Sequence, residues 1–231
     1  ESRGIGDVSK RQAEAYVKPL EENFIIVDVE KRRALIREQI EALGKKAGGH
    51  TAISEDLLDE VTYLVEYPTA LCGSIDDKYL KLQKEAVITL MRDHQRYFPV
   101  LDDSGKLLPY FITVRNGNSE HLDIVTHGNE RVLRARLDDA VFFFENDRKK
   151  SLEAHREALH DVAFQRGMGN MYEKTERLEA LTSCLLKESG VAADEKALVR
   201  AARLSKADLV TGMVTEFTEL QGTMGREYAL L

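Results

Sequence analysis

The 231-residue chain has 43% hydrophobic and 32% charged residues, a composition that suits one large globular domain or two smaller ones. Its net charge of −7 excludes the broad basic field that nonspecific nucleic-acid-binding proteins use, so any RNA contact must be local. Its apolar runs, such as 24–27 and 141–144, are far shorter than the roughly 18 residues that a membrane span requires.

The first half of the chain mixes helical and extended hydrophobic periods. Helices are predicted over 11–20, over 30–46 up to the Gly48-Gly49 pair, from Ser54 with its hydroxyl as the cap, and over 85–93. Strands are predicted over 24–27, 70–75, 97–101 and 107–115, and the last two form a β-hairpin around the loop Asp-Asp-Ser-Gly. Strands interleaved with helices predict an α/β or α+β layer domain.

The second half of the chain has a helical period throughout. A long helix is predicted from about Gly128, with Leu133, Leu137, Ala140, Val141 and Phe144 along one face. Ser151 can cap the next helix, and further helices are predicted over 172–187, 194–214 and 217–231. We therefore expect an α+β chain that consists of a mixed α/β domain over residues 1–150 and an all-helical domain over residues 151–231.

The two cysteines, Cys72 and Cys184, lie far apart in the apolar contexts ALCGS and LTSCLL. This spacing indicates neither a CxxC metal site nor a disulfide framework. We expect buried, reduced thiols in a cytoplasmic protein.

Five sequence blocks follow one another along the chain: LLDEVTYLVEYPTALCG (57–73), HQRYFPV (94–100), GNERVLRARLDDAVFFFENDRK (128–149), FQRGMGNMYEKTERL (164–178) and KADLVTGMVTEFTELQGTMGREYA (206–229). In this order the blocks resemble the beta subunit of bacterial-type, two-subunit glycyl-tRNA synthetase. The chain opens without a Met, and its end, REYALL, carries no Gly or Pro stop signal. We expect an internal fragment of such a subunit.

The resemblance implies a division of labour between two subunits. The aminoacylation site, which binds ATP, glycine and magnesium, is expected on a separate alpha subunit, so this fragment would hold no cofactor, no metal and no catalytic residue of its own. Its partners would be the alpha subunit and glycine tRNA, within a hetero-oligomer. The fragment would support tRNA positioning and subunit assembly.

The resemblance extends to two known domain types. Residues 1–150 resemble the B3/B4 domain that phenylalanyl-tRNA synthetase uses for editing, and the helices after them resemble an incomplete HD-type domain. Glycine has no smaller amino-acid competitor, and a pocket rejects larger ones by steric overlap. We therefore expect a structural or RNA-contacting role for the first domain, and hydrolysis of mischarged alanyl-tRNA by the fragment would contradict that expectation.

The most suggestive cationic cluster is Arg131, Arg134 and Arg136, at the start of the predicted long helix. Cations are disfavoured at a helix N-terminus unless an anion offsets them, and an RNA phosphate would do so. The alternative is intramolecular pairing of Arg134 with Asp138 and of Arg136 with Asp139, or contact with another subunit.

Two further groups are weaker RNA candidates. His94 and Arg96 in HQRYFPV lie beside aromatic rings that could stack an unpaired base, although core aromatics with hydrogen-bonded turn residues are the favoured interpretation. The basic run 148–150 is diluted by Glu145 and Asp147, and a solvated linker is favoured there.

A rival class is a metal-dependent phosphohydrolase of the HD type, because His155, His160-Asp161 and Asp208 follow the order of its ligands. His155 and His160 are five residues apart, so on one helix their side chains would point about 140° away from each other. Two side chains in this arrangement do not converge on one metal ion. By the resemblance, the HD pair itself would fall on Ala207-Asp208, where alanine cannot bind a metal. A protein–protein scaffold without RNA binding is the other alternative.

Overall fold

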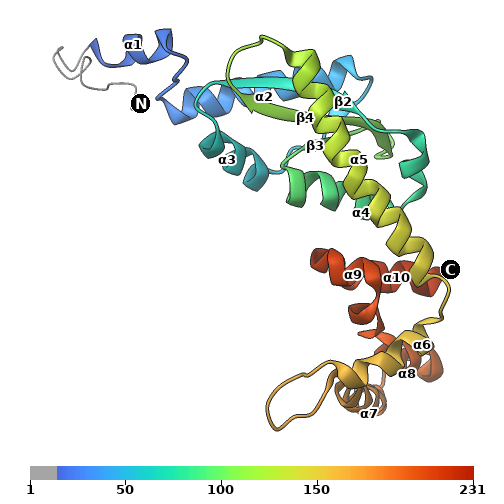
Figure 1. Ribbon diagram of the computed structural model, residues 1–231. Helices are drawn as coiled ribbons and strands as arrows, with labels where there is room; N and C mark the ends of the chain where they lie inside the picture. The colour runs from blue at the N-terminus through green and yellow to red at the C-terminus, as the bar shows by residue number, and fades with distance from the viewer. Residues whose placement is uncertain (1–14) are drawn as a thin grey trace. The chain divides into compact units, whose positions relative to one another are not determined.

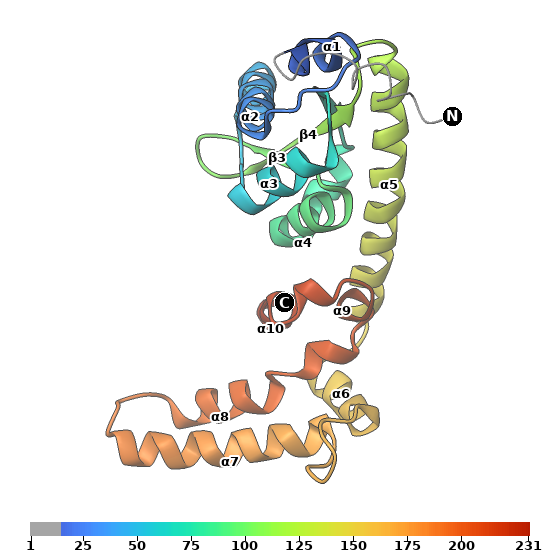
Figure 2. The same ribbon diagram turned by 90° about the vertical axis from the view of Figure 1, so that its left-hand side faces the viewer.

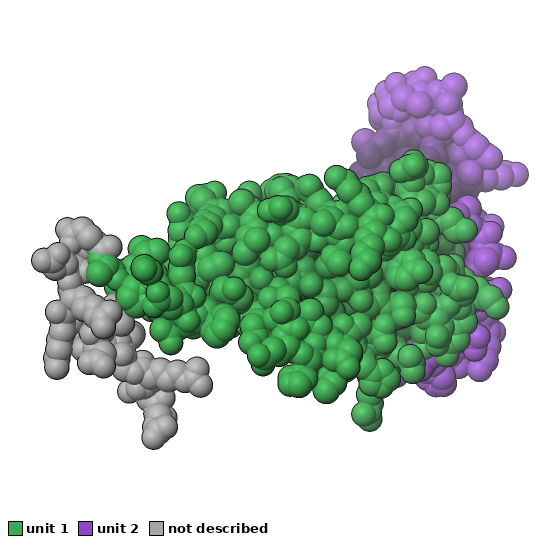
Figure 3. All heavy atoms as spheres, turned by 90° about the horizontal axis from the view of Figure 1, so that it is seen from above, with its two compact units in different colours: residues 1–137 green, residues 138–231 purple. Residues whose placement is uncertain are grey.

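The computed structural model describes residues 15–231, and the chain divides into two compact units, residues 1–137 and 138–231 (Figure 3). Unit 1 combines helices with a small antiparallel sheet, and the described part of unit 2 is helical, so the mixed α+β class is confirmed. The first residues of the helix predicted over 11–20 lie outside the described part, and α1 runs from Val17 to Glu22. No described helix is long and apolar enough to cross a lipid bilayer.

The sheet of unit 1 has four antiparallel strands in the order β1-β3-β4-β2. Strands β2, β3 and β4 are labelled in Figure 1. The strands are β1 (His50–Thr51), β2 (Pro68–Ser74), β3 (Phe98–Leu101) and β4 (Leu107–Asn116). The predicted β3–β4 hairpin is confirmed, with Phe98 opposite Ile112. Its turn is closed by Asp102, whose Oδ1 accepts the amides of Ser104 and Lys106 at 2.9 Å each.

One face of this sheet is covered by α2 (Val29–Lys46) and α3 (Glu55–Leu64). The helix predicted over 30–46 is confirmed, and its residues Ile36 and Ile40 are fully buried against Leu58, Phe98 and Ile112. Each such aliphatic side chain contributes about 1.5–3 kcal/mol when it leaves water. This hydrophobic cluster therefore contributes substantially to the stability of unit 1.

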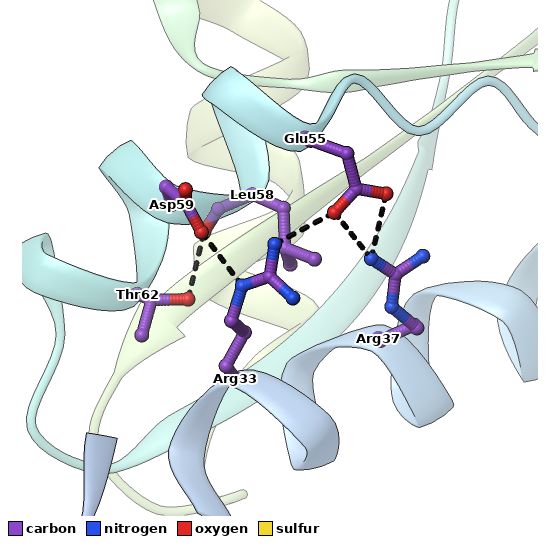
Figure 4. A network of polar contacts seen from close by, with 6 residues as sticks. All are labelled: Arg33, Arg37, Glu55, Leu58, Asp59 and Thr62. Atoms are coloured by element: carbon purple, nitrogen blue, oxygen red, sulfur yellow. Dashed lines mark hydrogen bonds and ion pairs between the residues drawn. The ribbon is translucent and has the colours of Figure 1, made fainter. Parts of the chain in front are cut away.

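An exposed network of ion pairs also joins α2 to α3 (Figure 4). Arg33 contacts Asp59 and Glu55 at 2.6 Å each, and Arg37 contacts Glu55 at 2.7 Å. Both arginines hold the pKa of Glu55 below its usual value. Because exposed pairs contribute little each, this network orients the two helices more than it stabilises them.

The first part of α5 (Leu122–Asp147) lies on the side of the sheet away from α2 (Figure 2). Helix α4 (Lys84–Thr89) continues into the π-helical turn η3 (Leu90–His94), which contacts β3. Tyr97 and Phe111 stack on the α5 side of the sheet with ring centroids 4.7 Å apart. Two polar contacts fix α5 to the sheet: the Tyr97 hydroxyl donates to Asn129 Oδ1 at 3.1 Å, and the Ser74 amide donates to Glu130 Oε1 at 2.8 Å.

Three predictions for unit 1 were wrong in detail. Residues 24–27 form no strand: Phe24 lies in a turn after α1 with φ +61 and is half exposed, and of these four side chains only Ile26 is buried. Ser54 precedes α3 as predicted, but its hydroxyl makes no capping hydrogen bond. The long helix α5 begins at Leu122 rather than near Gly128.

Unit 2 contains the end of α5, then α6 (Leu152–Glu157), η4 (Ala158–Asp161) and the hairpin of α7 (Met171–Ser189) and α8 (Glu195–Leu204) (Figure 2). Three short elements and a final helix follow: η5 (Ala207–Val210), α9 (Gly212–Glu216), η6 (Thr218–Leu220) and α10 (Thr223–Leu230). The Ser151 cap is confirmed, since its side chain accepts the Ala154 amide at 3.2 Å. The single helix predicted over 194–214 was wrong.

Two buried carboxylates explain this break. Asp147, at the end of α5, accepts the amides of Gly212 and Met213 at 2.7 and 2.9 Å and so caps α9. Asp208 accepts the amides of Gly222 and Gly225 at 2.6 and 3.1 Å, at the start of α10. These acceptors satisfy amides that a new helix leaves without partners, which makes short helices at these positions more stable than one long helix.

Candidate nucleic-acid interface

The predicted arginine cluster lies in the middle of α5, not at its N-terminus. The helix begins nine positions before Arg131, so the dipole argument for an anion at these residues does not hold. Arg131 and Arg134 are exposed and lie about 60° apart around the helix, whereas Arg136 is turned about 140° from Arg131. The structure therefore brings Arg131 and Arg134 together on one face and separates Arg136 from them.

Within residues 15–231, the side chains of Arg131 and Arg134 form no ion pair or hydrogen bond. The alternative that Arg134 pairs with Asp138 is thus not realised. The inner face of α5 is held by Asn129 and Glu130, so the outer face presents the two guanidinium groups to solvent. Two uncompensated cations on a fixed helix can bind phosphate oxygens.

His94 and Arg96 lie where η3 passes into β3. Arg96 has a left-handed backbone conformation with φ +58, and its Nε pairs with Glu60 Oε1 at 2.7 Å. Its guanidinium also donates to the Asp93 carbonyl. His94 ends the π-helical turn. The Arg96 guanidinium is therefore already paired, and its ion pair with Glu60 would have to break before it could contact another anion.

The aromatic residues of HQRYFPV belong to the core, as the favoured interpretation holds. Tyr97 is 5% exposed and Phe98 is fully buried. Burial raises the pKa of Tyr97 to about 12, and its ring is already stacked on Phe111. Neither ring is available to stack an unpaired base.

A pocket of about 1010 Å³ lies within unit 2, and sequence reasoning missed it. Its cationic lining consists of Arg148, Lys149 and Lys150 after α5, Arg200 from α8 and Arg226 from α10. Residues 148–150 are exposed, as a solvated linker would be, but they form part of this concave wall. No local sequence pattern could have predicted that these three segments, which are far apart in the sequence, line one pocket.

The residues that follow the HD ligand order have separate structural contacts. His155 Nε2 lies 3.0 Å from the Asp147 carbonyl, and the His160 ring stacks on Tyr172 at 3.8 Å. Asp208 binds backbone amides through Oδ2. No group of three His, Cys, Asp or Glu residues in the described part of the chain could hold a metal ion. The geometry does not favour the metal-dependent alternative.

The cysteine prediction holds only in part. Neither thiol is in a disulfide, but Cys184 is exposed on α7 and Cys72 is half-buried in β2. Burial raises the pKa of the Cys72 thiol. The apolar neighbours of Cys184 in the sequence misled the burial prediction, because none of residues 181–190 is buried and Leu181 and Leu185 are themselves exposed.

The chain matches one family of known proteins over almost its full length. The family described as "Glycyl-tRNA synthetase beta subunit" matches residues 3–231. The glycine–tRNA ligase beta subunit of Clostridioides difficile is 55% identical over 98% of this chain, and those of Trichlorobacter lovleyi and Moorella thermoacetica are 54% and 53% identical over 93% and 94% of it. The chain belongs to the glycyl-tRNA synthetase beta subunit family. It spans about a third of the length of these relatives.

Proposed function

We propose that this chain supports the ATP-dependent attachment of glycine to its tRNA, as one section of a beta subunit that positions the tRNA and assembles with an alpha subunit. Membership of the family supports this role. The structural observation that carries it is the pair Arg131 and Arg134, two exposed cations without ion-pair partners in the described structure, on a helix anchored to the sheet. In this proposal ATP and magnesium bind to the alpha subunit.

Positioning alone can raise the rate of such a reaction. A tRNA acceptor end that is held near an activated glycyl group reacts in a local encounter rather than a diffusional one. Arg131 and Arg134 are the first candidates for phosphate contact. Arg136, Arg96 and His94 are secondary candidates, because Arg136 faces another side of α5 and Arg96 is paired with Glu60.

The proposal includes a domain interpretation. Residues 1–150 would correspond to a B3/B4-like domain and residues 151–231 to an incomplete HD-like domain that has kept the fold without the metal chemistry. The use of Asp208 as a backbone acceptor beside Ala207 supports this view, since such a carboxylate is committed to the fold.

The test uses the complete two-subunit enzyme with Arg131→Ala and Arg134→Ala together. We expect weaker glycine-tRNA binding, a salt slope reduced by about one for each arginine and a lower kcat/KM for aminoacylation. Lys45→Ala with Lys46→Ala, two exposed cations at the end of α2, provides the charge-matched control.

Two outcomes would contradict this function in different ways. Unchanged tRNA affinity and aminoacylation would make the two arginines structural. Loss of alpha-subunit assembly, with normal tRNA binding by the enzyme that still forms, would support the scaffold alternative instead.

A further inference from the structure

The basic pocket of unit 2 is defined by five cationic side chains, Arg148, Lys149, Lys150, Arg200 and Arg226, with one carboxylate, Glu153, in its lining. The chain as a whole has a net charge of −7. Such a concentration of positive charge in one hollow is therefore opposite to the average of the molecule. Because the net charge of the chain is negative, an RNA contact needs a local positive field, and the cations of this pocket create one.

The cations of the pocket differ in how far they are neutralised. Arg200 pairs with Glu153 at 2.5 Å, and Arg226 pairs with Glu227. Within the described part of the chain, Arg148, Lys149 and Lys150 have no carboxylate partner. Three positive charges thus remain for a ligand.

These three residues are held in place by the backbone. The amides of Arg148, Lys149 and Lys150 donate to carbonyls of the last turn of α5, at 3.2–3.3 Å. The Arg148 guanidinium lies 5.4 Å from the centroid of the Phe144 ring, and Lys149 Nζ donates to Asn146 Oδ1 at 3.2 Å. The segment is an ordered extension of the helix rather than a free linker.

The lining favours contact with a backbone over contact with a base. Tyr228 is the one Phe, Tyr or Trp ring among the residues that line the pocket in the described structure. Its hydroxyl donates to Asp147 at 2.9 Å, and its ring already stacks on Phe144 with centroids 5.8 Å apart. Base stacking needs a free aromatic face, whereas lysine and arginine bind phosphate oxygens directly.

We propose that this pocket of unit 2 binds phosphate groups of an RNA backbone, as a second contact separate from Arg131 and Arg134. The inference rests on the proposed role in tRNA binding, because that role supplies the RNA. The contact is independent of base sequence. Lys149 and Lys150 each neutralise one phosphate, and Arg148 supports them from the end of α5.

The experiment measures tRNA affinity of the complete two-subunit enzyme against salt for Lys149→Gln with Lys150→Gln. The expected slope of log K against log[salt] falls by about 0.9 for each phosphate that a lysine no longer neutralises. At 0.1 M salt that slope corresponds to an affinity about eightfold weaker for each lysine. The same decrease is expected for an RNA of unrelated sequence.

Arg166→Gln with Lys187→Gln is the matched control, since both side chains are exposed in unit 2 and neither lines the pocket. An equal decrease in the control would show a general charge effect and overturn the proposal. Unchanged binding in the lysine variant would also overturn it. If the Arg131 and Arg134 variant still weakens binding in that case, the proposed function stands without this pocket.

A titration with inorganic phosphate separates an RNA site from a site for a small phosphorylated ligand. The proposal predicts that 10 mM phosphate displaces tRNA no more than sodium chloride of equal ionic strength does. Displacement well beyond that, abolished in the lysine variant, would assign the pocket to a small anion and refute the RNA backbone as its ligand.

Discussion

Asp147 should be the side chain on which the fold of unit 2 depends most. It is 5% exposed and accepts three hydrogen bonds, from the amides of Gly212 and Met213 and from the Tyr228 hydroxyl at 2.9 Å. Asp147→Ala removes a helix cap worth about 1–2 kcal/mol. It also leaves a half-buried hydroxyl without its acceptor, which costs about 1–3 kcal/mol. We expect the free energy of unfolding of unit 2 to fall by about 2–5 kcal/mol.

The assay must report on unit 2 alone, because a chain with two units need not unfold in one transition. Native-state hydrogen exchange, resolved along residues 138–231, gives the opening free energy of each segment. Asp147→Asn keeps one acceptor oxygen, so it should lower the opening free energy of unit 2 by less than Asp147→Ala does. Asp139→Ala, on the exposed face of the same helix, should stay within about 0.5 kcal/mol of the parent chain. Equal protection in Asp147→Ala and Asp139→Ala would refute the reasoning.

Three other predictions concern packing, pH and thiol reactivity. Gly73→Ala should destabilise unit 1 by about 1–3 kcal/mol in thermal unfolding, because its Cβ would collide with an aromatic ring of β4; Gly128→Ala, with open space around it, should stabilise by about 0.5–1 kcal/mol. Burial raises the pKa of Tyr97 to about 12, so the free energy of unfolding should fall as the pH rises from 10 through about 12. Comparison with Tyr97→Phe would detect this fall, because phenylalanine has no hydroxyl to ionise. Exposed Cys184 should react with a maleimide faster than Cys72, and equal rates in single-cysteine variants would contradict this.

Local patterns were sufficient where one element alone decides the structure. The helix over 30–46 and the hairpin of β3 and β4 were predicted from local patterns, and they carry the buried residues Ile36, Ile40 and Phe98. The start of α5 was missed because Gly128 lowers helix propensity by about 1 kcal/mol. Contacts of Asn129 and Glu130 with the sheet outweigh that cost, and no short window of sequence contains their partners.

Distant partners also account for what was missed in unit 2. The helical period of the sequence continues through 194–214. However, Asp147 accepts hydrogen bonds from two amides that lie 65 and 66 positions further along the chain, and this favours a new helix at Gly212. The basic pocket has the same origin, because Arg148, Arg200 and Arg226 become neighbours only after the helices have folded together. For the arginines of α5, the spacing in the sequence already sets Arg131 and Arg134 about 60° apart and Arg136 about 140° from Arg131. The missed helix start affected only the expectation that they lie at an N-terminus.

The order of His155, His160 and Asp208 shows why ligand order is weak evidence for a metal site until convergence is tested. Metal ligands must offer free lone pairs to one point. Here Asp208 binds two amides through Oδ2, and only its buried Oδ1 has no hydrogen-bond partner in the described structure. His155 Nε2 lies 3.0 Å from the Asp147 carbonyl, and the His160 ring is stacked on Tyr172. A carboxylate committed to capping helices cannot be withdrawn without exposing those amides. The same residue types in the same order therefore make structural contacts in unit 2, and among the described residues they do not come together as a group that could hold a metal ion.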